Sequence, residues 1–132
     1  MLFAAGAPAQ QQAIAGIGHS RKPTFTEFDA PGAGTGTLQG TDGFSINTAG
    51  AITGTYTDTS SVAHGFVRAA NGKIAEFDAP GAGGNGWLAW LTAKGKGPPD
   101  QETLAISINA AGAIAGTFAD KNGAYHGFLR TP

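Results

Sequence analysis

Residues 45–58 read SINTAGAITGTYTD, and residues 107–120 read SINAAGAIAGTFAD. Each string is followed by a second shared string, HGFVR at residues 64–68 and HGFLR at residues 126–130. Both pairs lie 62 positions apart, from 45 to 107 and from 64 to 126. Self-similarity at a fixed period is the sequence signature of a repeat architecture. The fold is therefore expected to be built from copies of one structural unit.

Composition favours short strands and tight turns within that unit. The 132 residues suffice for one domain, and the 41% that are hydrophobic suffice for a core. The 22 Gly and 7 Pro residues, with only 13% charged residues, are typical of a chain with many turns. Gly interrupts every Ala-rich run within a few residues, which disfavours long helices. The sequence predicts an all-β fold.

The first full copy contains four short strand candidates. Apolar and polar residues alternate along them with the period of a half-buried strand, as in Ile52, Gly54 and Tyr56. Pairs ending in Gly sit where two-residue hairpin turns need a positive φ, at Ala49-Gly50, Asn71-Gly72 and Asn122-Gly123. The strand candidates are Phe44 to Asn47, Ala51 to Thr57, Ala63 to Ala69 and Lys73 to Asp78. Four antiparallel strands in a repeat of about 40–50 residues are typical of a propeller blade.

Shorter matches set the domain organisation. TEFDAPGAG at residues 26–34 recurs as AEFDAPGAG 49 positions later, so a partial blade is expected at residues 13–34. Two full repeats follow at residues 35–83 and 84–132, which makes residues 13–132 one β-repeat domain. Between Gly83 and Ser107 the second repeat carries 13 residues that the first lacks, because the strings before this stretch recur at 49 positions and those after it at 62. Residues 1–12 are interpreted as a ragged terminus or a signal remnant.

Two blades and a fragment are fewer than the 4–8 blades with which propellers typically close. An open array would leave unpaired strand edges and an uncovered apolar face at both ends. Oligomerisation is therefore expected to close the ring, most simply as a homodimer of about five blades. The partial leading copy could supply strands that complete the last blade of a partner.

Charge and composition also exclude some partners. The formal net charge is −1, and the 8 Lys and Arg residues are scattered singly, so no nucleic-acid footprint is present. No apolar run approaches the roughly 20 residues of a membrane span. The first ten residues have the small-residue ending of an export signal without its basic start. Secretion or a periplasmic location is the expectation.

The repeat resembles the bacterial extracellular HAF-repeat family. The shared pattern is Ser-Ile-Asn-x-Ala-Gly-x-Ile-x-Gly followed by His-Gly-Phe-[Val/Leu]-Arg, and it covers residues 13–132 apart from the insertion. Gly65 and Gly127 stand where the family name has Ala. The resemblance implies a propeller-like secreted protein, and it implies no particular activity.

Three histidines are candidates for chemistry. His64 and His126 occupy identical places before Gly-Phe, and His19 is a displaced counterpart in the leading copy. The structural interpretation is that each imidazole ties a strand to a neighbouring turn. The catalytic interpretation is that the three converge on a shared axis, as a general base or a zinc site.

Acidic residues recur beside the FDAPGAG strings. Asp29 and Asp78 could accept backbone N–H groups of the turn that follows them. Alternatively, they could point into one opening and hold Ca²⁺, with Glu27 and Glu76 adding oxygen ligands. Residues 120–123 look faintly like a calcium loop but lack its spacing, and a plain hairpin is expected there.

Both tryptophans lie in the insertion of the second repeat. Trp87 and Trp90 are three residues apart in a stretch that ends in a Pro pair, which predicts a long loop. They either anchor that loop or line a substrate pocket for a sugar ring or an acyl chain.

Two functions follow from these candidates. The first is a small propeller hydrolase of a lactone or ester, with an axial Ca²⁺ that polarises the carbonyl and a histidine that moves protons. The second is a non-catalytic extracellular binding module, lectin-like, for a carbohydrate or another surface ligand. A small-molecule substrate or ligand is expected in both cases.

Overall fold

The computed structural model describes residues 22–83 and 102–132, and this part of the chain is all-β, as predicted. It contains seven strands and, within those ranges, no helix. The strands are β1 (Gly40–Ile46), β2 (Ile52–Thr57), β3 (Ala63–Arg68), β4 (Ile74–Phe77), β5 (Glu102–Ile108), β6 (Ile114–Ala119) and β7 (Tyr125–Arg130). The four strands predicted in the first repeat are thereby confirmed, with β1 beginning four residues earlier than expected.

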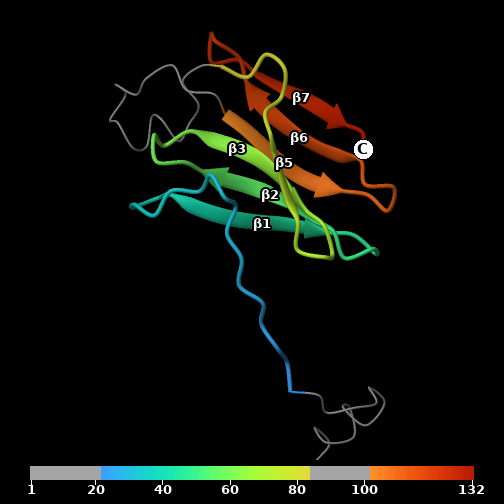
Figure 1. The fold of residues 1–132 in the computed structure, drawn as a ribbon. Coiled ribbons are helices and arrows are strands. Elements are labelled where there is room, and N and C mark those ends of the chain that lie inside the picture. The colour runs from blue at the N-terminus through green and yellow to red at the C-terminus, as the bar shows by residue number, and fades with distance from the viewer. Residues whose placement is uncertain (1–21, 84–101) are drawn as a thin grey trace, which may run out of the picture.

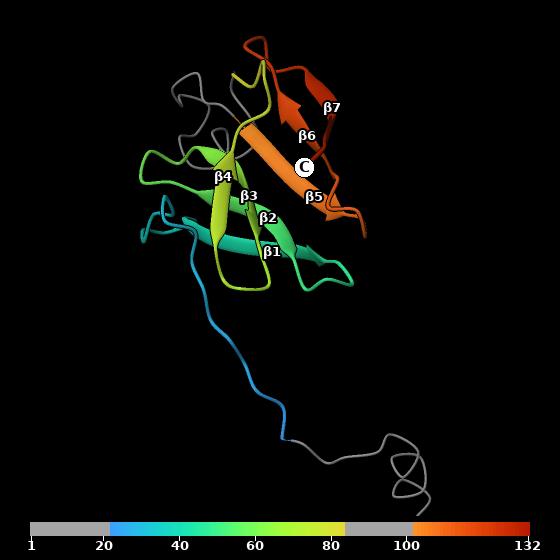
Figure 2. The same cartoon turned by 45° about the vertical axis from the view of Figure 1, so that its right-hand side comes forward.

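The strands form one open, mostly antiparallel sheet of two units. β1, β2 and β3 pair in sequence order, and β4 pairs with the other edge of β3. The second unit is β5, β6 and β7. A single parallel bridge between Ala63 and Glu102 joins the two units. Figures 1 and 2 show the two units packed together, with β4 crossing in front of the sheet.

The two units have the same register, including the same irregularity. The β1–β2 ladder shifts between Gly43 and Ser45, and the β5–β6 ladder shifts between Ala105 and Ser107. A large apolar residue is the extra residue in each bulge: Phe44 in β1, and Ile106 in β5. The sequence repeat therefore encodes a repeated bulge as well as repeated strands.

The Gly-x-Ile-x-Gly string has a separate physical reason at each glycine. Gly50 has a φ of 78°, which ends the turn before β2 in the left-handed region. Gly54 lies where β2 passes the bulge, and a Cβ there would overlap the carbonyl oxygen of Asp42. Ile52, between them, packs against the core of the first unit.

The turns differ from the two-residue hairpins expected. In each turn, the backbone carbonyl of the first residue accepts a hydrogen bond from the N–H three positions later. The backbone N–H of the same residue donates to the carbonyl four positions later, as in Asn47 with Gly50 and Ala51. This pattern is a three-residue loop whose third residue has a positive φ. It recurs at residues 47–51, 58–62, 69–73, 109–113 and 120–124. The third residue is glycine in four of the five turns, and it is Ser61, with a φ of 65°, in the remaining one.

The half-buried alternation expected for β2 is wrong. Residues 53–57 of this strand are buried without interruption, because both faces of β2 are covered. On one face, Tyr56 and Phe66 form a core with Ala30, against which Phe28 packs. On the other, the Ala105 N–H donates to the Thr55 hydroxyl (3.3 Å) across the gap between the units.

The FDAPGAG segments join each repeat to the next. Phe28 meets the ring of Phe66 edge-on at 6.0 Å, and Phe77 meets Phe128 in the same way at 6.1 Å. The guanidinium groups of Arg68 and Arg130 lie over Phe28 and Phe77, respectively. Backbone bonds repeat as well: Gly34 N–H to the Thr57 carbonyl, and Gly83 N–H to the Ala119 carbonyl. The string that ends one repeat in sequence therefore packs on the following unit.

Candidate functional site

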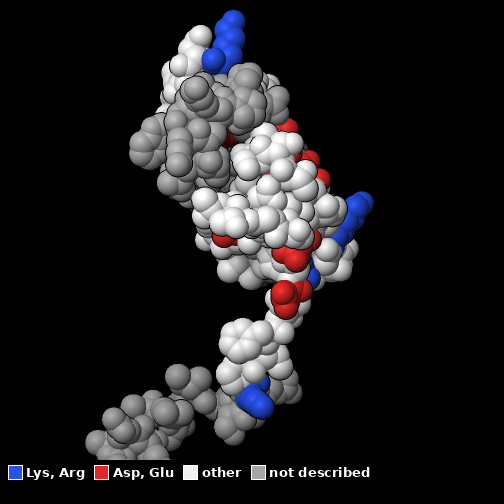
Figure 3. Space-filling model, turned by 90° about the vertical axis from the view of Figure 1, so that its left-hand side faces the viewer, with Lys and Arg blue, Asp and Glu red and all other residues white. Residues whose placement is uncertain are grey.

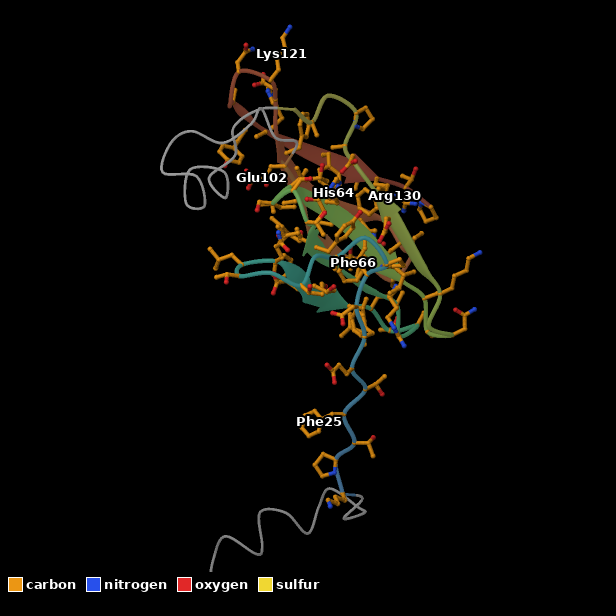
Figure 4. The ribbon with its side chains drawn as sticks, turned by 60° about the vertical axis from the view of Figure 1, so that its left-hand side comes forward. Phe25, His64, Phe66, Glu102, Lys121 and Arg130 are labelled. Atoms are coloured by element: carbon orange, nitrogen blue, oxygen red, sulfur yellow. The ribbon has the colours of Figure 1, made fainter. Side chains whose placement is uncertain are left out.

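His64 lies at the centre of a polar cluster on β3. Its Nδ1 is 2.7 Å from Oδ1 of Asp78, and its Nε2 is 3.5 Å from Oδ2 of Asp58. The imidazole stacks on the ring of Tyr56, with 4.9 Å between centroids. Figure 4 shows His64 within the sheet, on the same strand as Phe66. These contacts match the structural role, in which the imidazole ties β3 to a turn and to the segment after β4.

The cluster perturbs the ionisation of two groups. The hydrogen bond to Asp78 raises the pKa of His64 above its usual value, although partial burial acts in the opposite direction. Burial, followed by the charge of Glu76, raises the pKa of Tyr56 to about 12. The raised pKa means that the protonated imidazole of His64, which lies between two carboxylates, is stabilised relative to that of a free histidine.

The carboxylates around His64 also accept hydrogen bonds from backbone N–H groups. One oxygen of Asp58 accepts from the backbone N–H groups of Ser60 and Val62, at 2.8 and 2.9 Å. Glu76 accepts from the N–H of Gly32 (2.7 Å), which belongs to the preceding repeat string. Each of these acids fixes a turn or a junction between repeats.

His126 has a similar but more open site in the second unit. Its Nε2 is 3.3 Å from Oδ2 of Asp120, and its ring stacks on Phe118 at 5.2 Å between centroids. The side chain is 48% exposed, compared with 17% for His64. Asp120 also accepts from the N–H groups of Ala124 and Asn122, which lowers the pKa of this carboxyl. The plain hairpin expected at residues 120–123 is confirmed.

The acids predicted as Ca²⁺ ligands do not form a recognisable metal cluster in the described ranges. Within residues 22–83 and 102–132, no group of three or more His, Asp or Glu side chains is arranged to hold a metal ion. Asp29 is exposed, and Glu27 lines a shallow hollow of 470 Å³ beside Phe28 and Ile46. Calcium binding stays a prediction. His19, Trp87 and Trp90 lie outside the described residues.

A groove between the two units was not predicted from the sequence. It has a volume of 710 Å³ and runs along β1 and β5. The two bulge residues line it, with exposed fractions of 53% for Phe44 and 48% for Ile106. Among the described residues, the lining is Leu38, Gln39, Gly40, Thr41, Asp42, Phe44, Thr55, Thr57, Leu104 and Ile106. The bulged position shared by both copies is the sequence signal that could have indicated it.

Asp42 is the charged residue of this groove. It lies directly opposite Thr55 in the β1–β2 ladder, so the two side chains share one face of the sheet. Within the described part of the chain, the Asp42 carboxylate makes no hydrogen bond or ion pair. The equivalent position in the second repeat is Leu104, which lies in the same groove. One carboxylate therefore faces a mostly apolar lining.

The face of the molecule shown in Figure 3 has no cluster of basic side chains, since the Lys and Arg side chains there are few and separated. In the ranges that the structure describes, no helix has the length and apolar character needed to cross a bilayer. Comparisons with protein-family models, curated proteins and solved structures found no match. The HAF-repeat resemblance therefore stays an inference from the repeated motifs.

Proposed function

We propose that this protein is a non-catalytic binding module that takes a small amphiphilic ligand in the groove between β1 and β5. The apolar body of the ligand lies over Phe44 and Ile106, and its polar head donates hydrogen bonds to Asp42. The observation that carries the proposal is the exposed Asp42 carboxylate, which contacts no polar partner among the described residues and lines a mostly apolar groove of 710 Å³. The two units act as propeller-like blades in this proposal, and the setting is outside the cytoplasm, in line with the family resemblance.

Charge defines the head group. Among the described lining residues, Asp42 carries a formal charge and none is Lys or Arg. A carboxylate accepts hydrogen bonds only, so hydroxyl or ammonium groups satisfy it, whereas a second anion is repelled. The Thr55 hydroxyl already accepts from the Ala105 N–H. Its own O–H is available as a donor, which adds a weaker contact.

Apolar surface defines the body of the ligand. Phe44, Ile106 and Leu38 are each about half exposed, at 53%, 48% and 54%, and all three line the groove. Burying the exposed half of one such side chain under a ligand contributes on the order of 1 kcal/mol to the binding free energy. Aliphatic walls suit a short acyl or alkyl chain, and Phe44 provides an aromatic ring against which a sugar ring could pack.

The contacts of His64 argue against this histidine as the general base of a hydrolase. A general base needs a ring nitrogen that faces the substrate, and both nitrogens of His64 face carboxylates, those of Asp78 and Asp58. The Ca²⁺-assisted hydrolysis of a lactone or ester stays a prediction from the sequence. Incubation with a chromogenic ester and an acyl lactone tests it, and turnover that EDTA abolishes would favour the hydrolase.

Calorimetric titration with matched amphiphiles tests the binding proposal. Octyl glucoside and octylammonium, below their micelle concentrations, are expected to bind, and octanoate to bind at least tenfold more weakly. Asp42→Asn should remove the preference for the cation over octanoate, while Phe44→Ala should weaken all three ligands. Ile46→Ala is the matched control, because Ile46 is exposed on the same strand but does not line the groove.

Three outcomes would contradict the proposal: no binding of any octyl compound, equal binding of octanoate, or an equal loss in Ile46→Ala. Binding of free glucose or maltose with the same affinity as octyl glucoside would instead support the lectin-like alternative.

A further inference from the structure

We propose that residues 25–28 of one copy of this chain pair with β7 of a second copy and complete its second unit as a fourth strand. The donated segment repeats the sequence of β4, and β7 is the counterpart of the strand on which β4 lies. The partner is therefore another molecule of the same protein.

The receiving surface is the outer edge of β7. In the first unit, β3 pairs with β2 on one side and with β4 on the other. In the second unit, β7 pairs with β6 and forms the end of the sheet, so within the described residues no strand lies on its other side. Leu129 is 71% exposed on this strand. An exposed edge with free N–H and C=O groups is a template for an added strand.

The donated segment is available and extended. Residues 25–29 read FTEFD, where β4 and the residue after it read IAEFD, and APGAG follows both. Phe25 takes the place of Ile74, and its side chain is 97% exposed. Figure 4 shows Phe25 on an extended stretch that leaves the body of the molecule. β-strand addition by an extended peptide obtains affinity from main-chain hydrogen bonds and specificity from alternate side chains.

Half of the required junction is already formed. β4 pairs with β3 of the first unit, and its Phe77 packs on Phe128 of the second. Phe28 packs on Phe66 with the same edge-on geometry. Residues 25–28 thus make the forward contact of a β4 strand, and β7 of a second copy supplies the pairing that completes it.

The register follows from the repeat. Applying the β3–β4 pairs to β7 places Phe28 opposite Gly127, Thr26 opposite Leu129 and Phe25 opposite Arg130 of the receiving copy. Asp29 then lies within hydrogen-bond reach of His126 of the receiving copy, as Asp78 lies beside His64. Glu27 stands at Gly81 of the receiving copy, as Glu76 stands at Gly32.

Donor and receiver are different surfaces, so the contact is head to tail. Such contacts generate a closed ring when the rotation closes, and an open fibre when it does not. Two copies provide four complete units, at the lower end of the roughly 4–8 blades of known propellers. The leading segment completes an existing blade in this arrangement, so a dimer has four blades rather than the five suggested by counting sequence fragments.

A disulfide trap tests the register directly, because the chain has no cysteine. Thr26→Cys with Leu129→Cys places two thiols on directly paired residues, within the Cα spacing that a disulfide allows. Oxidation of the full chain should give cross-linked dimers or larger species on a non-reducing gel. Thr26→Cys with Arg130→Cys is the control, because its second thiol points to the other face of the sheet.

Light scattering on the full chain, with and without Thr26→Pro, provides the second measurement. A proline at residue 26 removes a ladder N–H from the donated strand, and Thr24→Pro, just before that strand, is the matched control. The wild type and Thr24→Pro should have the mass of a dimer or larger ring, and Thr26→Pro that of one chain with an unchanged circular dichroism spectrum. A monomeric wild type, a disulfide within one chain, or equal cross-linking in the Arg130→Cys control would each overturn the proposal.

Discussion

At the scale of single residues, His64 shows how a repeated polar side chain stabilises this fold. Its two nitrogens face Asp78 and Asp58, and its ring covers Tyr56. Because the raised pKa belongs to the folded state, the protonated imidazole contributes stability that is complete below its unfolded pKa. That stability is lost as pH rises through the folded pKa.

His64→Gln should therefore cost most at low pH. We expect a loss of about 1 kcal/mol near pH 6, since the site is partly exposed, and a smaller loss above pH 8. Thermal melts of the wild type and the variant between these pH values measure the difference. His126→Gln is the control, because the His126 side chain is 48% exposed and its ion pair is with Asp120 alone. A loss of stability for His64→Gln that grows with pH would contradict a stabilising interaction of protonated His64 with Asp78 and Asp58.

At the scale of elements, the five three-residue turns share one backbone hydrogen-bond pattern, and four of them have glycine at the third position. Glycine there adopts a positive φ without a steric penalty, whereas Ser61 adopts 65° with a Cβ. Ser61→Gly should stabilise the protein by up to about 0.5–1 kcal/mol, and Gly123→Ala, at a φ of 80°, should destabilise it by about 1 kcal/mol. Urea unfolding measures both. Equal effects of the same sign would show that backbone strain is not the cause.

The strands were predictable because their signals are local. Bulge, turn and strand recur at fixed positions in both copies, and the glycines of Gly-x-Ile-x-Gly mark a turn and a close approach. The burial of β2 on both faces was not predictable, because it depends on β5, which is 50 residues away along the chain. The groove escaped prediction for the same reason: Phe44 and Ile106 come together only when the two units pack.

At the scale of the whole molecule, Phe77 connects the two units, since it lies on β4 and packs on Phe128 beneath Arg130. Phe77→Ala should lower the free energy of unfolding by about 2–4 kcal/mol, within the range for large-to-small core changes, because the ring is only partly buried. Phe25→Ala is the control of equal size. With its side chain 97% exposed, it should leave the stability of one chain unchanged and weaken only the assembly. Guanidinium denaturation at low protein concentration separates the two, and equal losses would contradict this division.

The interlocking of repeats also has an evolutionary consequence. Each FDAPGAG string is encoded with one unit and packs on the next. A gene duplication that copies a whole unit therefore also copies the segment that binds the following unit. Arrays of this kind can therefore lengthen or shorten by whole units without inventing a new interface. A deletion that ends inside a unit, by contrast, would separate an FDAPGAG segment from the surface on which it packs.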